Sequence, residues 1–312
     1  MDFFDKNYLK IRNEHIIPKL EYGISRKKIE YWSFKEIITN RLISLTKLRG
    51  QTIEIELNIE DYYRALHCDI ELFLNKTTIQ YSDITLLNKT SLTWSFISIY
   101  YFAFFNATCL FRFLDNGFLF LSKVHCKRFE DFSSAVYSDS ISLNSGNYYF
   151  TLKEINSYGN VVLILNSKND SVHKSTWQLL ENIFKKFSKN SSNDEKVVFD
   201  LFLDHFSKFK SEFPSEIRNK LNYNGVSSIL DLEESIPSMK LSCIDSKFLK
   251  DLLKIDSNSS KYSEKMKSVT LLASYLFKLN TSLIQEFNER SIYGTDFKKE
   301  RGNYLKKRNI KN

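Results

Sequence analysis

The sequence contains little glycine and proline, with 8 Gly and 3 Pro among 312 residues. Both residues mark chains with many tight turns, so their scarcity argues against an all-β or low-complexity protein and favours long helices. None of the four cysteines stands in a CxxC pair, which excludes the usual spacing of structural zinc sites. The first 15 residues carry charges where a secretory signal is apolar, so we expect free thiols in a reducing cytoplasm.

Common enzyme motifs are also missing. The chain has no glycine-rich phosphate loop, no GxSxG, no HExxH and no carboxylate pair in a motif context. These absences argue against nucleotide hydrolases of the P-loop type, α/β-hydrolases and zinc proteases. We therefore expect neither a metal nor a cofactor.

Aromatic and basic residues are plentiful. Hydrophobic residues make up 42% of the chain and aromatic residues 15%, which is enough apolar material for a sizeable core. Lys and Arg number 45 against 37 Asp and Glu, a net charge of +8. This surplus suits an acidic partner such as nucleic acid, although it is too mild to identify one.

One long uncharged run stands out, "TSLTWSFISIYYFAFFNATCLF" at residues 90–111. About 20 apolar residues suffice to cross a bilayer as a helix, so its length allows a membrane span. Serines, threonines and Asn106 are spread through it, and Tyr100 and Tyr101 would lie near the bilayer midplane, where tyrosine is disfavoured. We favour a helix buried on most sides within a large domain, and we expect no membrane partner.

The rest of the chain predicts helices around a small β segment. Residues 1–50 indicate amphipathic helices broken near Gly23, and "TIEIELN" at 52–58 alternates like a short strand. Asn58 is placed to cap a helix from Ile59 to about Asn75. The two apolar runs between residues 138 and 167, separated by Gly- and Asn-containing turns, predict a β-hairpin or three-stranded meander.

The expected fold is mainly α, with a small β insertion and a C-terminal helical extension. A helix from about Glu195 to Phe213 is predicted to stop at Pro214, where a short helix begins. The domain organisation that we expect has three parts: an N-terminal helical segment at 1–57, a helical bundle with the β insertion at 58–235, and a helical region with a basic tail at 236–312.

The short helix "PSEIRNKLNYNG", residues 214–225, carries the most distinctive pair, Arg218 and Asn219. Arg offers a planar fork for phosphate oxygens, and the neighbouring amide can orient it or bind a ribose hydroxyl. Asn222 and Tyr223 extend the same candidate binding surface. A structural role is the alternative: Arg218 then pairs with an acid such as Glu216 or Asp204, and Tyr223 packs into the core.

Together, "WSFISIYYFAFFNA" and the later "RN" on a short helix resemble the HEPN superfamily. Its members are helical bundles, usually dimeric, and many are metal-independent endoribonucleases of toxin–antitoxin and antiphage defence systems. The family signature is an Arg followed, after four to six residues, by a His. The resemblance covers residues 58–225 and implies that Arg218 is the signature Arg and Asn219 the polar residue that follows it.

The position of the signature His is filled by Tyr223. Tyrosine is almost entirely protonated at neutral pH, so it donates a proton more readily than it accepts one, whereas His does both. His205 lies on the preceding helix and is the other candidate for the missing base. His173 stands near a helix start, where we interpret it as part of the cap.

Two functions from different classes remain open. The first is a HEPN-like component of a prokaryotic antiphage defence or toxin system that binds RNA or nucleotide and cleaves RNA without a metal, through Arg218, Tyr223 and His205. The second is a non-catalytic scaffold or dimerisation subunit of a defence complex. Both imply a homo-oligomer or a complex with a partner protein.

Overall fold

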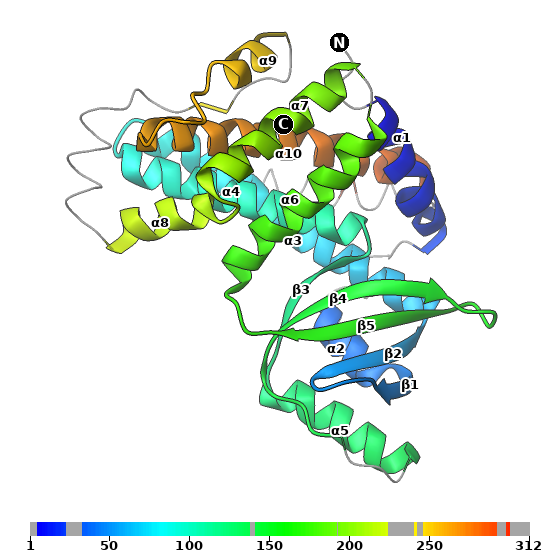
Figure 1. The fold of residues 1–312 in the computed structure, drawn as a ribbon. Coiled ribbons are helices and arrows are strands. Elements are labelled where there is room, and N and C mark those ends of the chain that lie inside the picture. Colours follow the sequence, from blue (N-terminus) through cyan, green and yellow to red (C-terminus); the bar gives the residue numbers. More distant parts are fainter. Residues whose placement is uncertain are drawn as a thin grey trace.

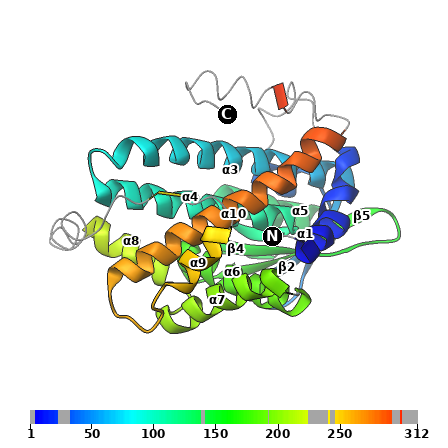
Figure 2. The ribbon, with the colours of Figure 1, turned by 90° about the horizontal axis from the view of Figure 1, so that it is seen from above.

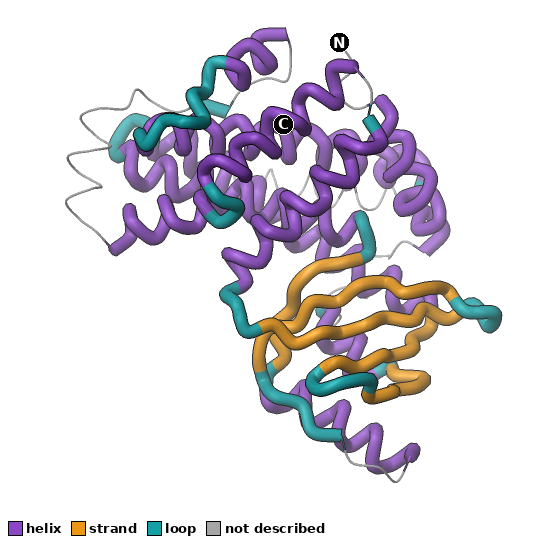
Figure 3. Tube along the Cα trace, viewed as in Figure 1, coloured by secondary structure: helices purple, strands orange, loops and turns teal. Residues whose placement is uncertain are grey.

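The structure is a computed structural model, and its described residues are 5–22, 33–137, 141–191, 193–223, 240–241, 246–291 and 298–299. Helices dominate this part of the chain, and the strands form a single antiparallel sheet (Figures 1 and 3). The expectation of a mainly helical fold with a small β element is confirmed at this level.

The helices fall into a short N-terminal group and a set of longer helices. Their bounds are α1 Asp5–Ile11, η1 Arg12–Ile16, η2 Ile17–Tyr22, α2 Phe34–Asn40, α3 Ile59–Leu87, α4 Leu92–Phe113, α5 Lys123–Tyr137, α6 Val172–Asn190, α7 Asn193–Phe209, α8 Phe213–Tyr223, α9 Ser246–Leu253 and α10 Tyr262–Arg290. The cap predicted at Asn58 is present, and Ser171 caps α6, which was not predicted. Asn58 accepts a hydrogen bond from the Glu60 backbone N–H at 2.8 Å, and Ser171 accepts one from that of Lys174 at 3.3 Å.

The sheet is larger than the sequence predicts. Its strands are β1 Leu42–Lys47, β2 Thr52–Asn58, β3 Asn116–Leu121, β4 Gly146–Ile155 and β5 Asn160–Lys168, in the order β1-β2-β5-β4-β3. The predicted hairpin is β4–β5, but β2 pairs with β5 and β3 with β4, so the β element is not a local insertion. The predicted strand at 52–58 is confirmed as β2. The prediction of helices throughout residues 1–50, and so of a helical segment at 1–57, is wrong, because β1 forms at Leu42–Lys47 and pairs with β2.

The long uncharged run is a core helix. Helix α4 is long and apolar enough to span a membrane, yet 83% of its most apolar window is buried inside the fold. Helices α3 and α10 pack along it (Figure 2). Asn106, which has no evident partner in the sequence, is fully buried and accepts hydrogen bonds from Asn280 Nδ2 of α10 at its backbone and side-chain oxygens. Trp94 is the exception to the predicted burial, since it lies in the first turn and is 58% exposed.

Several predicted boundaries shift. Helix α3 continues to Leu87 rather than Asn75, and α7 ends at Phe209 rather than Phe213. Pro214 is the second residue of α8, as its fixed φ and missing N–H favour. Gly23 and Gly225 lie outside the described residues, as does nearly all of the predicted basic tail. The three-part domain division stays a prediction, although α10 packs on α4 of the predicted bundle.

Candidate functional site

Arg218 lies where three helices meet. Helix α8, which carries it, packs against α4 and α6, and α4 and α6 also contact each other. The resulting Arg218 cluster draws side chains from separate parts of the chain: Tyr100, Tyr101, His173, Ser215, Arg218 and Asn219. The structure thus joins the "YY" of the long helix to the "RN" of the short one.

Among the described residues, the groups that hydrogen-bond the guanidinium of Arg218 are neutral. Its Nη2 donates to the Tyr101 hydroxyl at 2.8 Å and to Nε2 of His173 at 3.3 Å, and its Nη1 donates to Asn219 Oδ1 at 2.5 Å. It also lies over the rings of Tyr100 and Tyr101, at 5.8 and 5.5 Å from their centroids.

Within the described part of the chain, no carboxylate forms an ion pair with the half-buried Arg218 side chain, and its Nε is buried without a hydrogen-bond partner. Of the acids suggested as partners, Glu216 is exposed, and Asp204 accepts a hydrogen bond from Ser257 instead. A partly buried cation without a counter-ion is a natural contact for an anionic ligand.

His173 supplies a titratable group beside that cation. It is the second residue of α6, and the cap itself is Ser171, so its interpretation as part of the cap is wrong. Burial, followed by the positive charge of Arg218, lowers the pKa of His173 to about 4. The imidazole is therefore neutral at pH 7.

The hydrogen bonds of His173 determine its tautomer. A guanidinium can only donate, so Nε2 accepts from Arg218 and the proton of the neutral ring lies on Nδ1. Nδ1 then donates to the Tyr100 hydroxyl at 2.8 Å, and that hydroxyl can donate onward to Ser215 Oγ at 3.3 Å. Burial raises the pKa of Tyr100, which keeps its phenol protonated at neutral pH. In the free protein the unprotonated Nε2 therefore faces the Arg218 cation and accepts its hydrogen bond.

The other predicted site residues do not join this cluster. His205 is 2% exposed and hydrogen-bonds Ser268 of α10 at 2.9 Å, so the expectation that it approaches Arg218 is not met. Tyr223 is 81% exposed, which excludes its packing into the core. Five residues along a helix turn it about 140° away from Arg218. Asn222 is exposed one turn beyond Arg218.

His173 is the residue of this candidate site that sequence reasoning missed. It lies 45 residues before Arg218, so no local spacing connects the two. The sequence offers one weak signal. A protonated His is unfavourable in the first turn of a helix, next to the positive end of the helix dipole, so a His at that position suggests a specific role.

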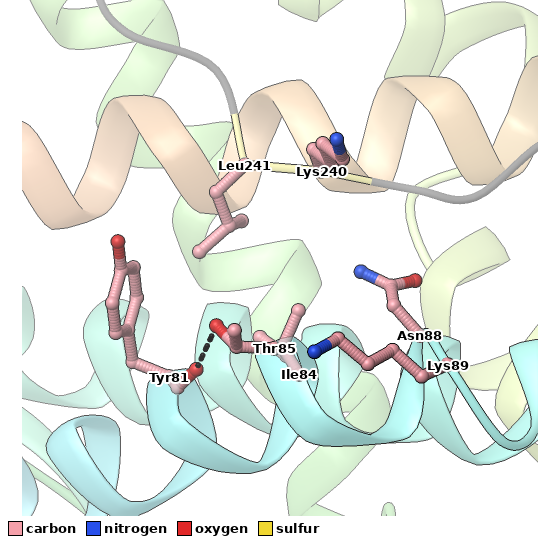
Figure 4. Close-up of a pocket in the computed structure, with 7 residues that line it drawn as sticks. All are labelled: Tyr81, Ile84, Thr85, Asn88, Lys89, Lys240 and Leu241. Carbon is pink, nitrogen blue, oxygen red and sulfur yellow. Dashed lines mark hydrogen bonds between the residues drawn. The ribbon is translucent and has the colours of Figure 1, made fainter.

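A separate hollow of about 520 Å³ lies at the C-terminal end of α3, and Figure 4 shows it. Tyr81 and Thr85 lie on one side, with Thr85 Oγ1 donating to the Tyr81 carbonyl, and Lys240 and Leu241 face them. No residue of the Arg218 cluster lines it, so it adds nothing to the candidate site.

Comparison of the chain with protein-family models, with curated proteins and with solved structures finds no match.

Proposed function

We propose that the chain binds RNA at the Arg218 cluster and cleaves it without a metal ion, as a HEPN-like component of a prokaryotic antiphage defence or toxin system. The observation that carries the proposal is the contact between an arginine that has no counter-ion among the described residues and a neutral histidine 3.3 Å away. Phosphate is the anion for which the arginine fork is best suited. The defence context rests on the resemblance to the HEPN superfamily.

The chemistry that this pair can perform is transesterification at phosphorus. Arg218 would bind the non-bridging oxygens of a phosphodiester and stabilise the charge that develops on them. Once the guanidinium turns to the phosphate, Nε2 of His173 is released and can accept the proton of the ribose 2′-hydroxyl. The 2′-oxygen attacks phosphorus, the bond to the 5′-oxygen breaks, and that oxygen takes up a proton from water, which in turn takes back the proton held by His173. The products are a 2′,3′-cyclic phosphate and a 5′-hydroxyl.

Here His173 replaces the signature His of the family as the proton acceptor, and Tyr223 has no part in the chemistry. The Tyr101 hydroxyl, which accepts from Arg218, keeps its own proton available for the substrate. Asn219 holds the guanidinium from its other side. Tyr100 orients the imidazole from the buried side.

Binding and cleavage of a single-stranded RNA oligonucleotide test the proposal. Arg218→Ala should abolish cleavage and weaken binding, and Arg218→Lys should recover only part of the binding, because an ammonium keeps the charge but loses the fork. Arg64→Ala is the matched control, since Arg64 forms a surface ion pair with Glu60 on α3. It should leave both activities unchanged.

His173→Asn separates chemistry from binding. The amide can keep a hydrogen bond toward Tyr100 but cannot accept the proton, so binding should persist while cleavage in the presence of EDTA is lost. Tyr223→His should not increase cleavage, since position 223 is exposed and away from the guanidinium.

The second candidate function is a non-catalytic scaffold subunit of a defence complex, favoured by the absence of a His at position 223. Under that proposal the chain self-associates or holds a partner protein through the bundle that carries Arg218. A folded wild-type protein that neither binds nor cuts RNA, yet forms a stable oligomer in light scattering, would support the scaffold and contradict the ribonuclease.

A further inference from the structure

A second polar groove, of about 460 Å³, lies on another part of the molecule. In Figure 1 it corresponds to the region where α1 and the turn after it (dark blue) lie beside the C-terminal end of α6, over β4. Its walls come from the end of α1, η1, the C-terminal end of α6, and strands β3 and β4. No lining residue belongs to the Arg218 cluster, whose one residue on α6, His173, lies at the opposite end of that helix. Its volume falls within the range of ordinary small-ligand sites.

His15 lines this groove, and a buried carboxylate fixes its ring. Nδ1 of His15 lies 2.9 Å from Oδ2 of Asp115. The His15 side chain is 28% exposed, whereas that of Asp115 is 4% exposed. An ionised carboxylate only accepts, so Nδ1 carries a proton and Nε2 is left for a ligand; within the described chain Nε2 has no hydrogen bond.

Asp115 is itself held rigidly from the inside of the protein. Lys19 Nζ donates to its Oδ2 at 2.8 Å and Tyr62 donates to its Oδ1 at 3.0 Å. Burial alone would raise the pKa of Asp115, but Lys19 and His15 outweigh it and hold the pKa below its ordinary value. The backbone of Asp115 is left-handed, with φ of 57°, a strained conformation that native structures keep mainly where surrounding contacts impose it.

The groove is basic and has an aromatic wall. Lys10, Lys186 and Lys189 line it against a single carboxylate, Glu14. Tyr149 of β4 contributes a half-buried ring, and its neighbour Asn116 has a buried Oδ1 without a hydrogen-bond partner. Lysines bind phosphate groups through charge-assisted hydrogen bonds, and a tyrosine ring can stack on the face of a base. A carboxamide can hydrogen-bond the polar edge of that base.

We propose that this groove, between η1, the end of α6 and β4, is a binding site for a nucleotide. Its phosphates contact Lys186, Lys189 and Lys10, its base packs on Tyr149, and His15 hydrogen-bonds the ligand through Nε2. The site does not depend on RNA binding or cleavage at Arg218, because none of its lining residues belongs to the Arg218 cluster.

Isothermal titration calorimetry with three probes, namely ATP, inorganic tripolyphosphate and adenosine, tests the proposal. Wild type should bind ATP more tightly than tripolyphosphate. Lys186→Gln with Lys189→Gln should weaken ATP binding at least about tenfold, since hydrogen bonds to charged groups are the strong ones. The control is Lys185→Gln with Lys208→Gln, which removes the same charge from α6 and α7 outside the groove and should change affinity little. Lys185 pairs with Glu181.

His15→Asn tests what the His15–Asp115 pair contributes to ATP binding. Tyr149→Ala should reduce the difference in affinity between ATP and tripolyphosphate. All titrations are repeated with Arg218→Ala, so that ATP bound at the Arg218 cluster is not counted.

Equal affinity of wild type and the Lys186/Lys189 double variant for ATP would overturn the groove as the site. Equal affinity for ATP and tripolyphosphate would overturn the nucleotide assignment. Exposed Lys186 and Lys189 keep the test valid even if His15→Asn fails to fold.

Discussion

Arg218 Nη2 lies 3.3 Å from Nε2 of His173, so a guanidinium donates a hydrogen bond to an imidazole across the contact between α8 and α6. The two residues are 45 positions apart. The arginine has no anionic partner in the described part of the chain, and its positive charge adds to burial in lowering the pKa of the histidine. The positive charge of Arg218 therefore favours the neutral form of His173, and His173 accepts a hydrogen bond from Arg218. We expect an anion that binds Arg218 to change both the hydrogen bond and the pKa of His173.

The pKa of His173 should rise when RNA or phosphate binds. In the free protein burial and the charge of Arg218 lower this pKa to about 4. A bound phosphate offsets that positive charge, so the protonated imidazole becomes less unfavourable. NMR titration of the ring nitrogens, with and without a single-stranded oligonucleotide, measures the change. In Arg218→Ala the free pKa should already be higher and the added RNA should have little effect. An unchanged pKa in the wild-type complex would contradict a direct contact with phosphate.

Acid should destabilise the protein through His205. Burial lowers its pKa to about 4, and Asp204 and Glu264 only partly oppose this. Between pH 6.5 and 4 the unfolded chain binds a proton that the folded protein does not, so the free energy of unfolding falls as the pH falls. The lowering of the pKa from 6.5 to about 4 corresponds to a change of about 3 kcal/mol in the free energy of unfolding. Urea unfolding of wild type and His205→Gln at pH 7.5 and pH 5 measures it. The variant should show a clearly smaller difference between the two pH values; equal differences would show that His205 titrates normally.

Gly117→Ala should destabilise the fold by about 3 kcal/mol, as severe backbone and packing conflicts do. Gly117 has φ of 141°, and a Cβ there would lie 1.9 Å from Nη1 of Arg112. Arg112 cannot swing away, because it is 2% exposed, paired with Asp69 at 2.8 Å and hydrogen-bonded to the Phe118 carbonyl. Thermal unfolding gives the comparison with Gly146→Ala, where a Cβ meets nothing within 4 Å. That control should unfold at nearly the wild-type temperature.

Lys19→Met should also destabilise the protein, by about 3 kcal/mol, because it removes one partner of a buried ion pair and leaves Asp115 charged in the core. Lys19 and Asp115 side chains are each 4% exposed. Burial lowers the pKa of Lys19, and the nearby Asp115 only partly restores it. Adding Asp115→Asn to Lys19→Met should recover part of the loss in denaturant unfolding. Lys127→Met breaks an exposed pair with Asp131 and should have almost no effect.

The sequence by itself determined the elements that depend on local patterns. The apolar run of α4, the cap at Asn58, the β4–β5 alternation and Pro214 at the start of α8 all follow from side-chain period and backbone preference. The "YY" and "RN" pairs were recognisable as candidates for the same reason. Their residues are few and consecutive, so their type is visible without the fold.

Only the tertiary structure decided which residues meet. Strand β3 is a short edge strand whose partner β4 begins 30 residues after β3 does, and β2, which also pairs with β1, pairs with β5 more than 100 residues later. Pairing between strands that are distant in the sequence produces no periodic pattern of side chains that the local sequence could reveal. Likewise Tyr223 and His205 lie close to Arg218 in sequence but face elsewhere, since the helix turn and the α7–α8 corner orient them differently. His173 and Asp115 acquire their chemistry from burial and from neighbours brought in by packing, and those are properties of the folded chain.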